Sequence, residues 1–156
     1  MAKKKTETFV FRGLGFPIKL VNVPMKKMAG ERVIDINMNK LMSVVFEALA
    51  HKPTALTSGE LYFIRSYLKM HTKEFGKSFG VPQTVVLGWE SRKTKISPSL
   101  ELCIRLFMMN YLKAKDKEFR ALYNELNLEE LSRTPKAKIH PITVDVVGRE
   151  DLKIAL

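Results

Sequence analysis

The sequence contains a single cysteine, Cys103, among its 156 residues. One thiol excludes a disulfide within the chain and any metal site built on paired cysteines. Cys103 lies inside the apolar run L-E-L-C-I-R-L-F-M-M, so we expect it to be a small, buried core residue. This cysteine usage is typical of a reducing compartment, and we expect a cytoplasmic protein.

Long apolar runs are lacking as well, and so is an apolar segment near the N-terminus of the kind that directs secretion. We therefore expect no membrane partner. The three histidines, His51, His71 and His140, are scattered without metal-ligand spacing. The sequence shows no glycine-rich phosphate loop, paired-carboxylate motif or nucleophile elbow. We expect no catalytic residue, no metal and no cofactor.

Positive charge is abundant, because 27 basic residues face 16 acidic ones and give a formal net charge of +11. Residues 1–56 carry 10 basic and 4 acidic side chains, residues 57–96 carry 7 and 3, and residues 97–156 carry 10 and 9. The excess therefore lies on the first two-thirds of the chain. A basic surface raises the affinity for phosphate and the association rate. The charge agrees with a nucleic-acid partner, although a solvated basic surface would have the same composition.

The segment 72–90, T-K-E-F-G-K-S-F-G-V-P-Q-T-V-V-L-G-W-E, predicts two short helices joined by a glycine turn. Thr72 is a suitable N-cap for the first helix. Phe75 and Phe79 lie four residues apart and should share one buried face. Gly76, between them, is small where a second helix must cross closely.

The second half of this segment supplies the turn and the next helix. Gly80 suits the left-handed residue that ends a helix, and Pro82 suits the first turn of the helix that follows. Val86 and Trp89, three residues apart, should form the buried stripe of that helix. Glu90 should be a local polar cap or pair. The pattern predicts a helix-turn-helix, a DNA-reading structure.

At these residues the chain resembles the Cro/phage-repressor (XRE-type) class of helix-turn-helix DNA-binding proteins. The matching residues are Thr72, Phe75, Gly76, Phe79, Gly80, Val81, Val86, Trp89 and Glu90. The chain departs from the usual pattern at Pro82, Leu87 and Gly88, which lie off the packing positions. The resemblance implies that the second helix enters the major groove of double-stranded DNA.

A looser resemblance covers about residues 9–107 and is to bacterial regulators that act as antitoxins or plasmid-type repressors. The order G-L-G, K-L-V-N-V, Gly30-Glu31, a helix and L-T-S-G-E-L-Y-F-I-R-S-Y-L carries it. Some relatives have a zinc module built on cysteines, which this chain lacks, so metal binding does not carry over. The resemblance implies a homodimeric repressor of its own operon. The alternative is an antitoxin that neutralises a protein toxin and autoregulates its operon.

The residues expected to read bases lie on the face of the second helix opposite its buried stripe, and they are Gln83, Thr84, Leu87 and Ser91. Gln83 is the strongest, because its amide can pair with N6 and N7 of adenine. Leu87 could contact only a thymine methyl group or a sugar, and core packing or a dimer contact is an equal alternative. The residues expected to contact phosphates are Thr72, Lys73, Lys77, Arg92, Lys93 and Lys95.

The whole chain predicts an α+β fold, with a helix-turn-helix part of about five helices and a small antiparallel β portion. The β signals run from Thr8 to about Ile36, and I-T-V-D-V at 142–146 alternates like a strand that could pair with the N-terminal sheet of the same chain or of a second copy. Further helices are expected at about 38–50, 57–69, 98–113 and 116–127. The helix at 98–113 should bury Leu100, Ile104, Phe107, Met108 and Tyr111.

We expect three segments. Residues 1–52 should form a β-rich module with a helix, and residues 53–134 should form the helix-turn-helix part with the helices that follow. Residues 135–156 should form a C-terminal strand and tail. The apolar residues of the 98–126 helices and of the 139–147 strand exceed what one small core needs. We therefore expect a dimer surface there.

Overall fold

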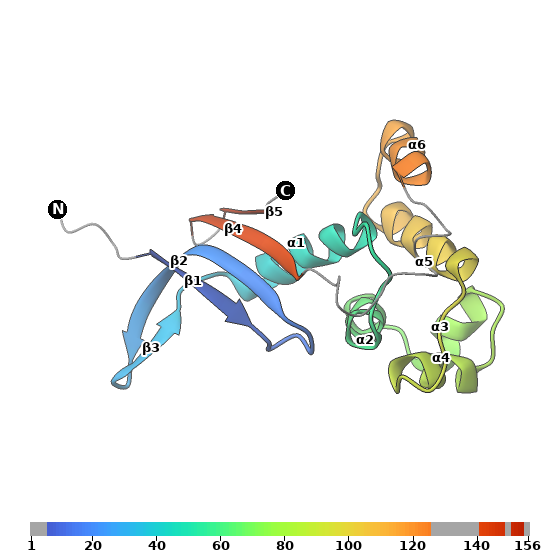
Figure 1. Ribbon diagram of the computed structural model, residues 1–156, viewed down its shortest axis with the longest axis horizontal. Coiled ribbons are helices and arrows are strands. Elements are labelled where there is room, and N and C mark those ends of the chain that lie inside the picture. The colour runs from blue at the N-terminus through green and yellow to red at the C-terminus, as the bar shows by residue number, and fades with distance from the viewer. Residues whose placement is uncertain (1–5, 126–140, 149–150, 155–156) are drawn as a thin grey trace. The chain divides into compact units, whose positions relative to one another are not determined.

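The computed structural model describes residues 6–125, 141–148 and 151–154. The chain forms two compact units. Unit 1 comprises residues 1–48 and 141–156, and unit 2 comprises residues 49–140. Figure 1 shows the elements in chain order, with strands at both ends of the sequence and helices between them. The α+β class expected from the sequence is confirmed.

Unit 1 is built on a five-stranded sheet. Its strands are β1 (Thr6–Phe11), β2 (Ile18–Met28), β3 (Glu31–Ile34), β4 (Ile142–Gly148) and β5 (Asp151–Ile154). The order is β1-β2-β4-β5, and β3 pairs with β2. The N-terminal strands β1, β2 and β3 pair antiparallel, as expected, and so do β4 and β5, but β4 lies parallel to β2, so the sheet as a whole is mixed. Two parallel strands need a long connection, because the chain must return from the end of the first strand to the edge of the sheet where that strand began. The connection between β2 and β4 is long enough for this return.

The core of unit 1 follows from the register of these strands. Phe9 of β1 lies opposite Leu20 of β2, which lies opposite Val144 of β4, which lies opposite Ile154 of β5. Opposed residues point to the same face, and Leu20 and Val144 are fully buried there, whereas Phe9 on the outer strand is 41% exposed. The neighbouring pair Val146 and Leu152 is buried as well and completes the core of the sheet. The C-terminal strand thus pairs with the N-terminal sheet of the same chain, one of the two pairings expected. β5 was not predicted from the sequence.

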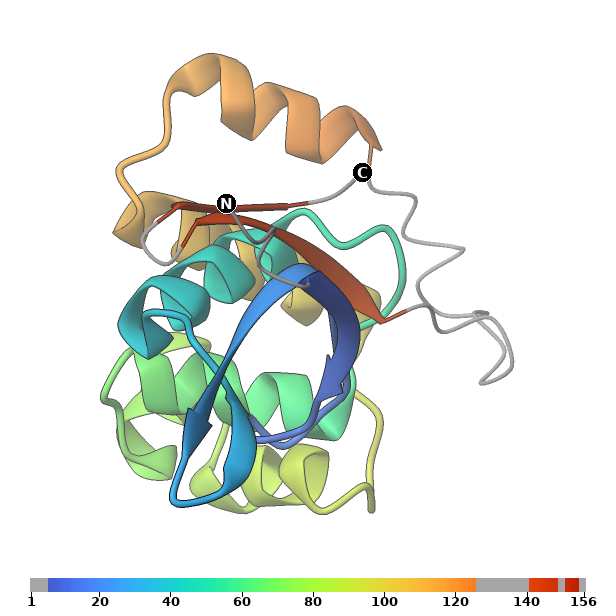
Figure 2. The same ribbon diagram turned by 90° about the vertical axis from the view of Figure 1, so that its left-hand side faces the viewer.

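Three of the helix starts agree with the caps expected from the sequence. Asn37 Oδ1 accepts the amide of Lys40 at 3.1 Å at the start of α1 (Met38–Ala50), which runs alongside the sheet in Figures 1 and 2. Thr57 and Glu60 form a capping box at the start of α2 (Ser58–Tyr67). Ser97 caps α5 (Pro98–Tyr111). α6 extends over Asp116–Glu125, and the last two residues expected in it lie outside the described part.

The buried stripe of α5 differs from the expected one. Ile104 and Met108 are buried as expected, but Tyr111 is 53% exposed and Cys103 is also exposed, so both predictions of burial were wrong. The stripe instead includes two charged residues that the sequence analysis left out of the core, Glu101 and Arg105. A stripe through 101, 104, 105, 108 and 109 turns position 103 away from the core.

Arg105 is 0% exposed, and its guanidinium fills the place where α1 ends. Nη1 donates to the carbonyl oxygens of Leu49, Ala50 and Lys52 (3.2, 3.3 and 2.5 Å), and Nη2 donates to that of Thr54 (2.7 Å). The last carbonyls of a helix have no partner within the helix, and a cation is favourable beside them. Arg105 therefore closes the C-terminal end of α1 and holds the chain that follows it.

Carboxylates complete this buried network. Glu101 Oε1 accepts from Arg105 Nη2 and from the amide of Leu56, both at 2.8 Å. Glu60 pairs with Lys52 Nζ at 2.5 and 3.0 Å, and both of these side chains are buried. The non-helical chain between α1 and α2 is thus fixed by charged side chains from α5 and α2. A buried charge is tolerated when it is paired and hydrogen-bonded in this way.

Replacing Arg105 by Met should lower the free energy of unfolding of unit 2 by about 3–5 kcal/mol, because Glu101 and the carbonyl oxygens would lose their partner while still buried. Trp89, the single tryptophan, lies in unit 2 and reports its unfolding by fluorescence in urea. Arg120→Met on α6 is the matched control, because Arg120 is exposed and its loss should change stability by about 0.5 kcal/mol or less. Equal effects of the two substitutions would contradict a structural role of the network.

Candidate nucleic-acid interface

The predicted helix-turn-helix is formed by α3 (Thr72–Ser78) and α4 (Gln83–Glu90), which pack on each other. The carbonyl of Gly76 accepts the amides of Phe79 (3.1 Å) and Val81 (2.9 Å), which closes the turn. Gly80 has φ +70°, so the residue expected to be left-handed is left-handed. A Cβ on Gly76 would lie 2.6 Å from the carbonyl oxygen of Val81 in the turn and 3.2 Å from a methyl carbon of Val86 on α4, which confirms that the second helix crosses closely there.

The apolar contacts of the pair also agree with the sequence. Phe75, Val86 and Trp89 are buried, and the rings of Phe75 and Phe79 pack edge to face with centroids 5.0 Å apart. Phe79 further packs against Phe107 of α5, with centroids 5.4 Å apart. These contacts hold α3 and α4 on a common core.

Two of the predicted helix ends lie one residue away from where they were expected. His71, not Thr72, is the N-cap residue of α3, and Thr72 is the first helical residue. Pro82 has ψ 155° and is the N-cap residue of α4 instead of lying in its first turn. The hydroxyl of Thr72 has another partner, because it accepts a hydrogen bond from Nε2 of Gln83 at 2.8 Å. This bond joins the starts of α3 and α4.

The other end of α4 is joined to α2. Arg65 donates from Nε to Glu90 Oε1 (2.6 Å) and from Nη2 to Glu90 Oε2 (3.1 Å), a bidentate pair. Nη1 of Arg65 donates to the carbonyl of Met70 at 2.9 Å, and the guanidinium lies over the ring of Tyr62. Glu90 is therefore paired, but its partner lies 25 residues away on another helix, so the expectation of a local cap or pair was wrong. With Gln83 and Glu90 both bonded, α4 is fixed at its two ends.

The face of α4 opposite the core is exposed. Gln83, Thr84, Leu87 and Ser91 are all exposed, so the structure brings the four expected base-reading residues to one surface. Leu87 is 47% exposed, which rules out the core-packing alternative for this residue. Gly88 is half-buried, because Thr94 lies over it: a Cβ there would be 2.6 Å from the hydroxyl oxygen of Thr94.

The loop that follows α4 is tied back to the helix. The carbonyl of Gly88 accepts the amides of Lys93 (3.0 Å) and Thr94 (3.3 Å), and that of Trp89 accepts the amide of Arg92 (3.4 Å). Arg92 has φ 64°, the left-handed conformation. This is the Schellman arrangement, in which the residue after the C-cap is left-handed. The loop that carries the expected phosphate contacts is thus ordered by the helix itself.

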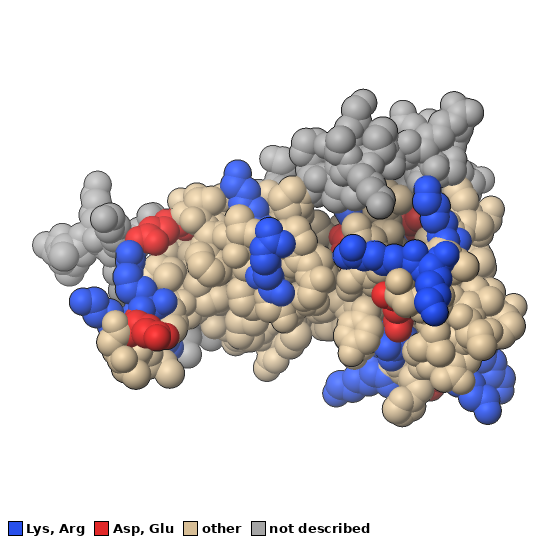
Figure 3. Space-filling model, turned by 60° about the horizontal axis from the view of Figure 1, so that its bottom comes forward, with Lys and Arg blue, Asp and Glu red and all other residues tan. Residues whose placement is uncertain are grey.

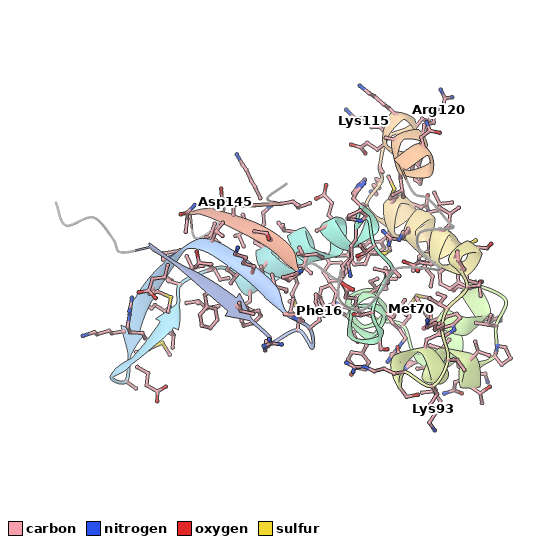
Figure 4. The ribbon with its side chains drawn as sticks, in the orientation of Figure 1. Phe16, Met70, Lys93, Lys115, Arg120 and Asp145 are labelled. Carbon is pink, nitrogen blue, oxygen red and sulfur yellow. The ribbon has the colours of Figure 1, made fainter. Side chains whose placement is uncertain are left out.

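The cations expected to contact phosphates are exposed. They are Lys73 and Lys77 on α3 and Arg92, Lys93 and Lys95 on the loop, whereas Thr72 is half-buried. Figure 3 shows several Lys and Arg side chains on this face of unit 2, with a few Asp and Glu side chains among them. Figure 4 shows Lys93 projecting at the α4 end of unit 2, whereas Lys115 and Arg120 lie at the α6 end. The exposed polar face of α4 therefore has cations beside it.

Other kinds of site find no support in the part of the chain that the structure describes. No three His, Cys, Asp or Glu side chains in it are grouped so that they could hold a metal ion. No helix in the same residues has the length and apolar character needed to cross a bilayer.

Replacing Gly76 by Ala should lower the free energy of unfolding by about 1–3 kcal/mol, because the new methyl group would collide with a backbone carbonyl that cannot move alone. Gly88→Ala is the matched comparison. The three atoms nearest to its methyl group would all belong to the side chain of Thr94, which can rotate, and alanine is favoured over glycine in a helix interior by about 1 kcal/mol. In urea, the free energy of unfolding of the Gly76→Ala variant should be well below that of the Gly88→Ala variant. The reverse order would contradict the close crossing at Gly76.

Comparisons of the chain with models of protein families, with curated proteins and with solved structures gave no match. What can be inferred about this surface therefore comes from its geometry and its charge.

Proposed function

We propose that this chain is a sequence-specific DNA-binding repressor that places α4 in the major groove. One observation carries the proposal: α4 is bonded to the framework at both ends, and its free face presents Gln83, Thr84, Leu87 and Ser91 beside exposed cations. A short helix that is fixed in this way and bordered by positive charge suits insertion between two phosphate backbones.

Gln83 is the residue with the clearest role in base reading. One N–H of its amide is used by Thr72, which leaves the second N–H and the Oε1 acceptor for a ligand. Adenine presents the complementary pair, an N7 acceptor and an N6 donor, at one edge in the major groove. The bond to Thr72 also fixes the amide plane, so less side-chain entropy is lost when a base binds. Gln83 therefore reads adenine in this proposal.

The cations around α4 supply affinity that does not depend on sequence. Each Lys or Arg that neutralises a phosphate releases a counterion and makes binding weaker at higher salt. Lys73 and Lys77 lie on α3, and Arg92, Lys93 and Lys95 follow α4, so cations precede and follow the reading helix along the chain. These cations position α4, and Gln83 and its neighbours discriminate between sequences.

We further propose that the protein acts as a homodimer. One helix-turn-helix reads only a few base pairs, and specific repression generally requires two heads about one helical turn apart. Part of the dimer surface expected from the sequence is occupied, because Val144 and Val146 of β4 are buried within the chain. The dimer surface therefore falls on the helices after α4, where Tyr111 of α5 is exposed. A toxin partner, the alternative implied by the wider resemblance, stays a prediction.

Replacing Gln83 by Ala should cost about 1–3 kcal/mol of discrimination at one base position, because the bidentate contact to one base would be lost. Lys93→Ala should weaken binding to all sequences about equally and make the salt dependence shallower by about one unit. Titration of both variants against a selected duplex, single-base variants of it and several salt concentrations would separate the two effects. Binding unchanged in both variants would contradict the assignment of α4 to the groove.

A dimer should be visible in solution. Light scattering at micromolar concentration should give twice the chain mass of 17.9 kDa for the free protein, or a complex with DNA whose mass equals two chains plus one duplex. A single chain per particle under both conditions would remove the homodimer from the proposal without affecting the reading by α4.

A further inference from the structure

Three helices of unit 2 are followed by a cation in the left-handed conformation. The residues are Lys69 after α2 (φ 56°), Arg92 after α4 (φ 64°) and Lys113 after α5 (φ 55°). Each of the three helices ends in its own turn, and the three turns have the same pattern of hydrogen bonds. The amide of Lys113, for example, donates to the carbonyl of Asn110 (3.1 Å) and the next amide to that of Met109 (3.0 Å). After α3 the equivalent position is occupied by Gly80, with φ +70°.

Glycine is the residue favoured at this position, because a Cβ is crowded in the left-handed conformation. A lysine or arginine there lowers stability unless its side chain contributes something in return. One contribution is common to all three cations, since positive charge is favourable beside the C-terminal end of a helix. This effect is small at an exposed site and does not distinguish Arg92 from the other two.

Arg92 differs in what surrounds it. It directly follows Ser91 of the proposed reading face and directly precedes Lys93, and all three side chains are exposed. Its backbone direction is fixed by the bonds from Arg92 and Lys93 to the carbonyls of Trp89 and Gly88 (3.4 and 3.0 Å). Lys113 is two residues from Lys115, which lies at the opposite end of unit 2 from Lys93 (Figure 4).

We propose that Arg92 is a preorganised phosphate-binding residue, kept at a left-handed position where glycine would make the fold more stable. The inference rests on the proposed DNA binding by α4. The planar guanidinium can donate two parallel hydrogen bonds to phosphate oxygens, which a lysine cannot do. Because the turn fixes the Cα–Cβ direction of Arg92 relative to α4, a bound phosphate sets the depth and register of the helix in the groove. At this position the fold gives up some free energy of unfolding, and the protein gains affinity for DNA.

The test compares Arg92→Gly with Lys113→Gly in the full-length chain. Both substitutions replace a left-handed cation by glycine, and both should raise the melting temperature by roughly 2–6 °C. Only Arg92→Gly should weaken binding to a selected DNA duplex, by about tenfold at 0.15 M salt, with a salt dependence about one unit shallower. Arg92→Lys should keep the salt dependence, recover part of the affinity and melt at the temperature of the unsubstituted chain.

Two results would overturn the inference. If Arg92→Gly bound DNA with unchanged affinity and salt dependence while Gln83→Ala still altered base preference, α4 would read DNA without Arg92. The second result would be a melting temperature below that of the unsubstituted chain for Arg92→Gly and above it for Lys113→Gly. Arg92 would then stabilise the fold, and its presence would not lower stability in favour of DNA affinity. Failure of the unsubstituted chain to bind any selected duplex would remove the proposed function, and this inference with it.

Discussion

The buried guanidinium of Arg105 is the interaction on which the arrangement of unit 2 depends. It bonds to the last carbonyls of α1, to the chain that leads to α2 and to Glu101 on its own helix. Glu101 in turn holds the amide of Leu56, directly before the capping box that starts α2. A change at Arg105 would therefore move the start of α2 as well as the end of α1.

A second set of polar contacts leads from α2 to the reading face. Arg65 of α2 fixes the end of α4 through Glu90, and Thr72 of α3 fixes its start through Gln83. These pairs lie at the two ends of α4, and Val86 and Trp89 anchor its middle in the core. The charged side chains that determine where α4 lies are thus largely buried and paired, whereas those proposed to contact DNA are exposed. This separation lets the rim residues be varied without loss of the fold.

Local signals in the sequence predicted most of the helical part. Asn37, Thr57 and Ser97 cap helices because their side chains reach amides within the same turn, so neighbouring residues suffice to identify them. Gly76 and Gly80 were predicted from the same short segment. The predicted starts of α3 and α4 differ from the observed ones by one residue. Thr72 was expected to cap α3, but its hydroxyl bonds to Gln83 of the next helix instead.

Contacts between distant residues were missed. Arg105 bonds to carbonyls more than 50 residues earlier, and β4 pairs with β2 across most of the chain, so no local pattern could have predicted either contact. One signal was present and unused. Glu101 and Arg105 lie four residues apart inside an apolar run, a spacing at which two opposite charges can pair on the buried face. The left-handed conformation of Arg92 had no sequence signal, because glycine is the residue that usually indicates it.

Selection of bound DNA from a random pool tests the central claim most directly. If α4 reads the major groove as part of a dimer, the recovered sequences should share an inverted repeat whose half-sites are centred about 10 base pairs apart, or a multiple of that distance. Each half-site should contain an adenine whose replacement reduces binding. Recovery of no common sequence from the pool would contradict the account.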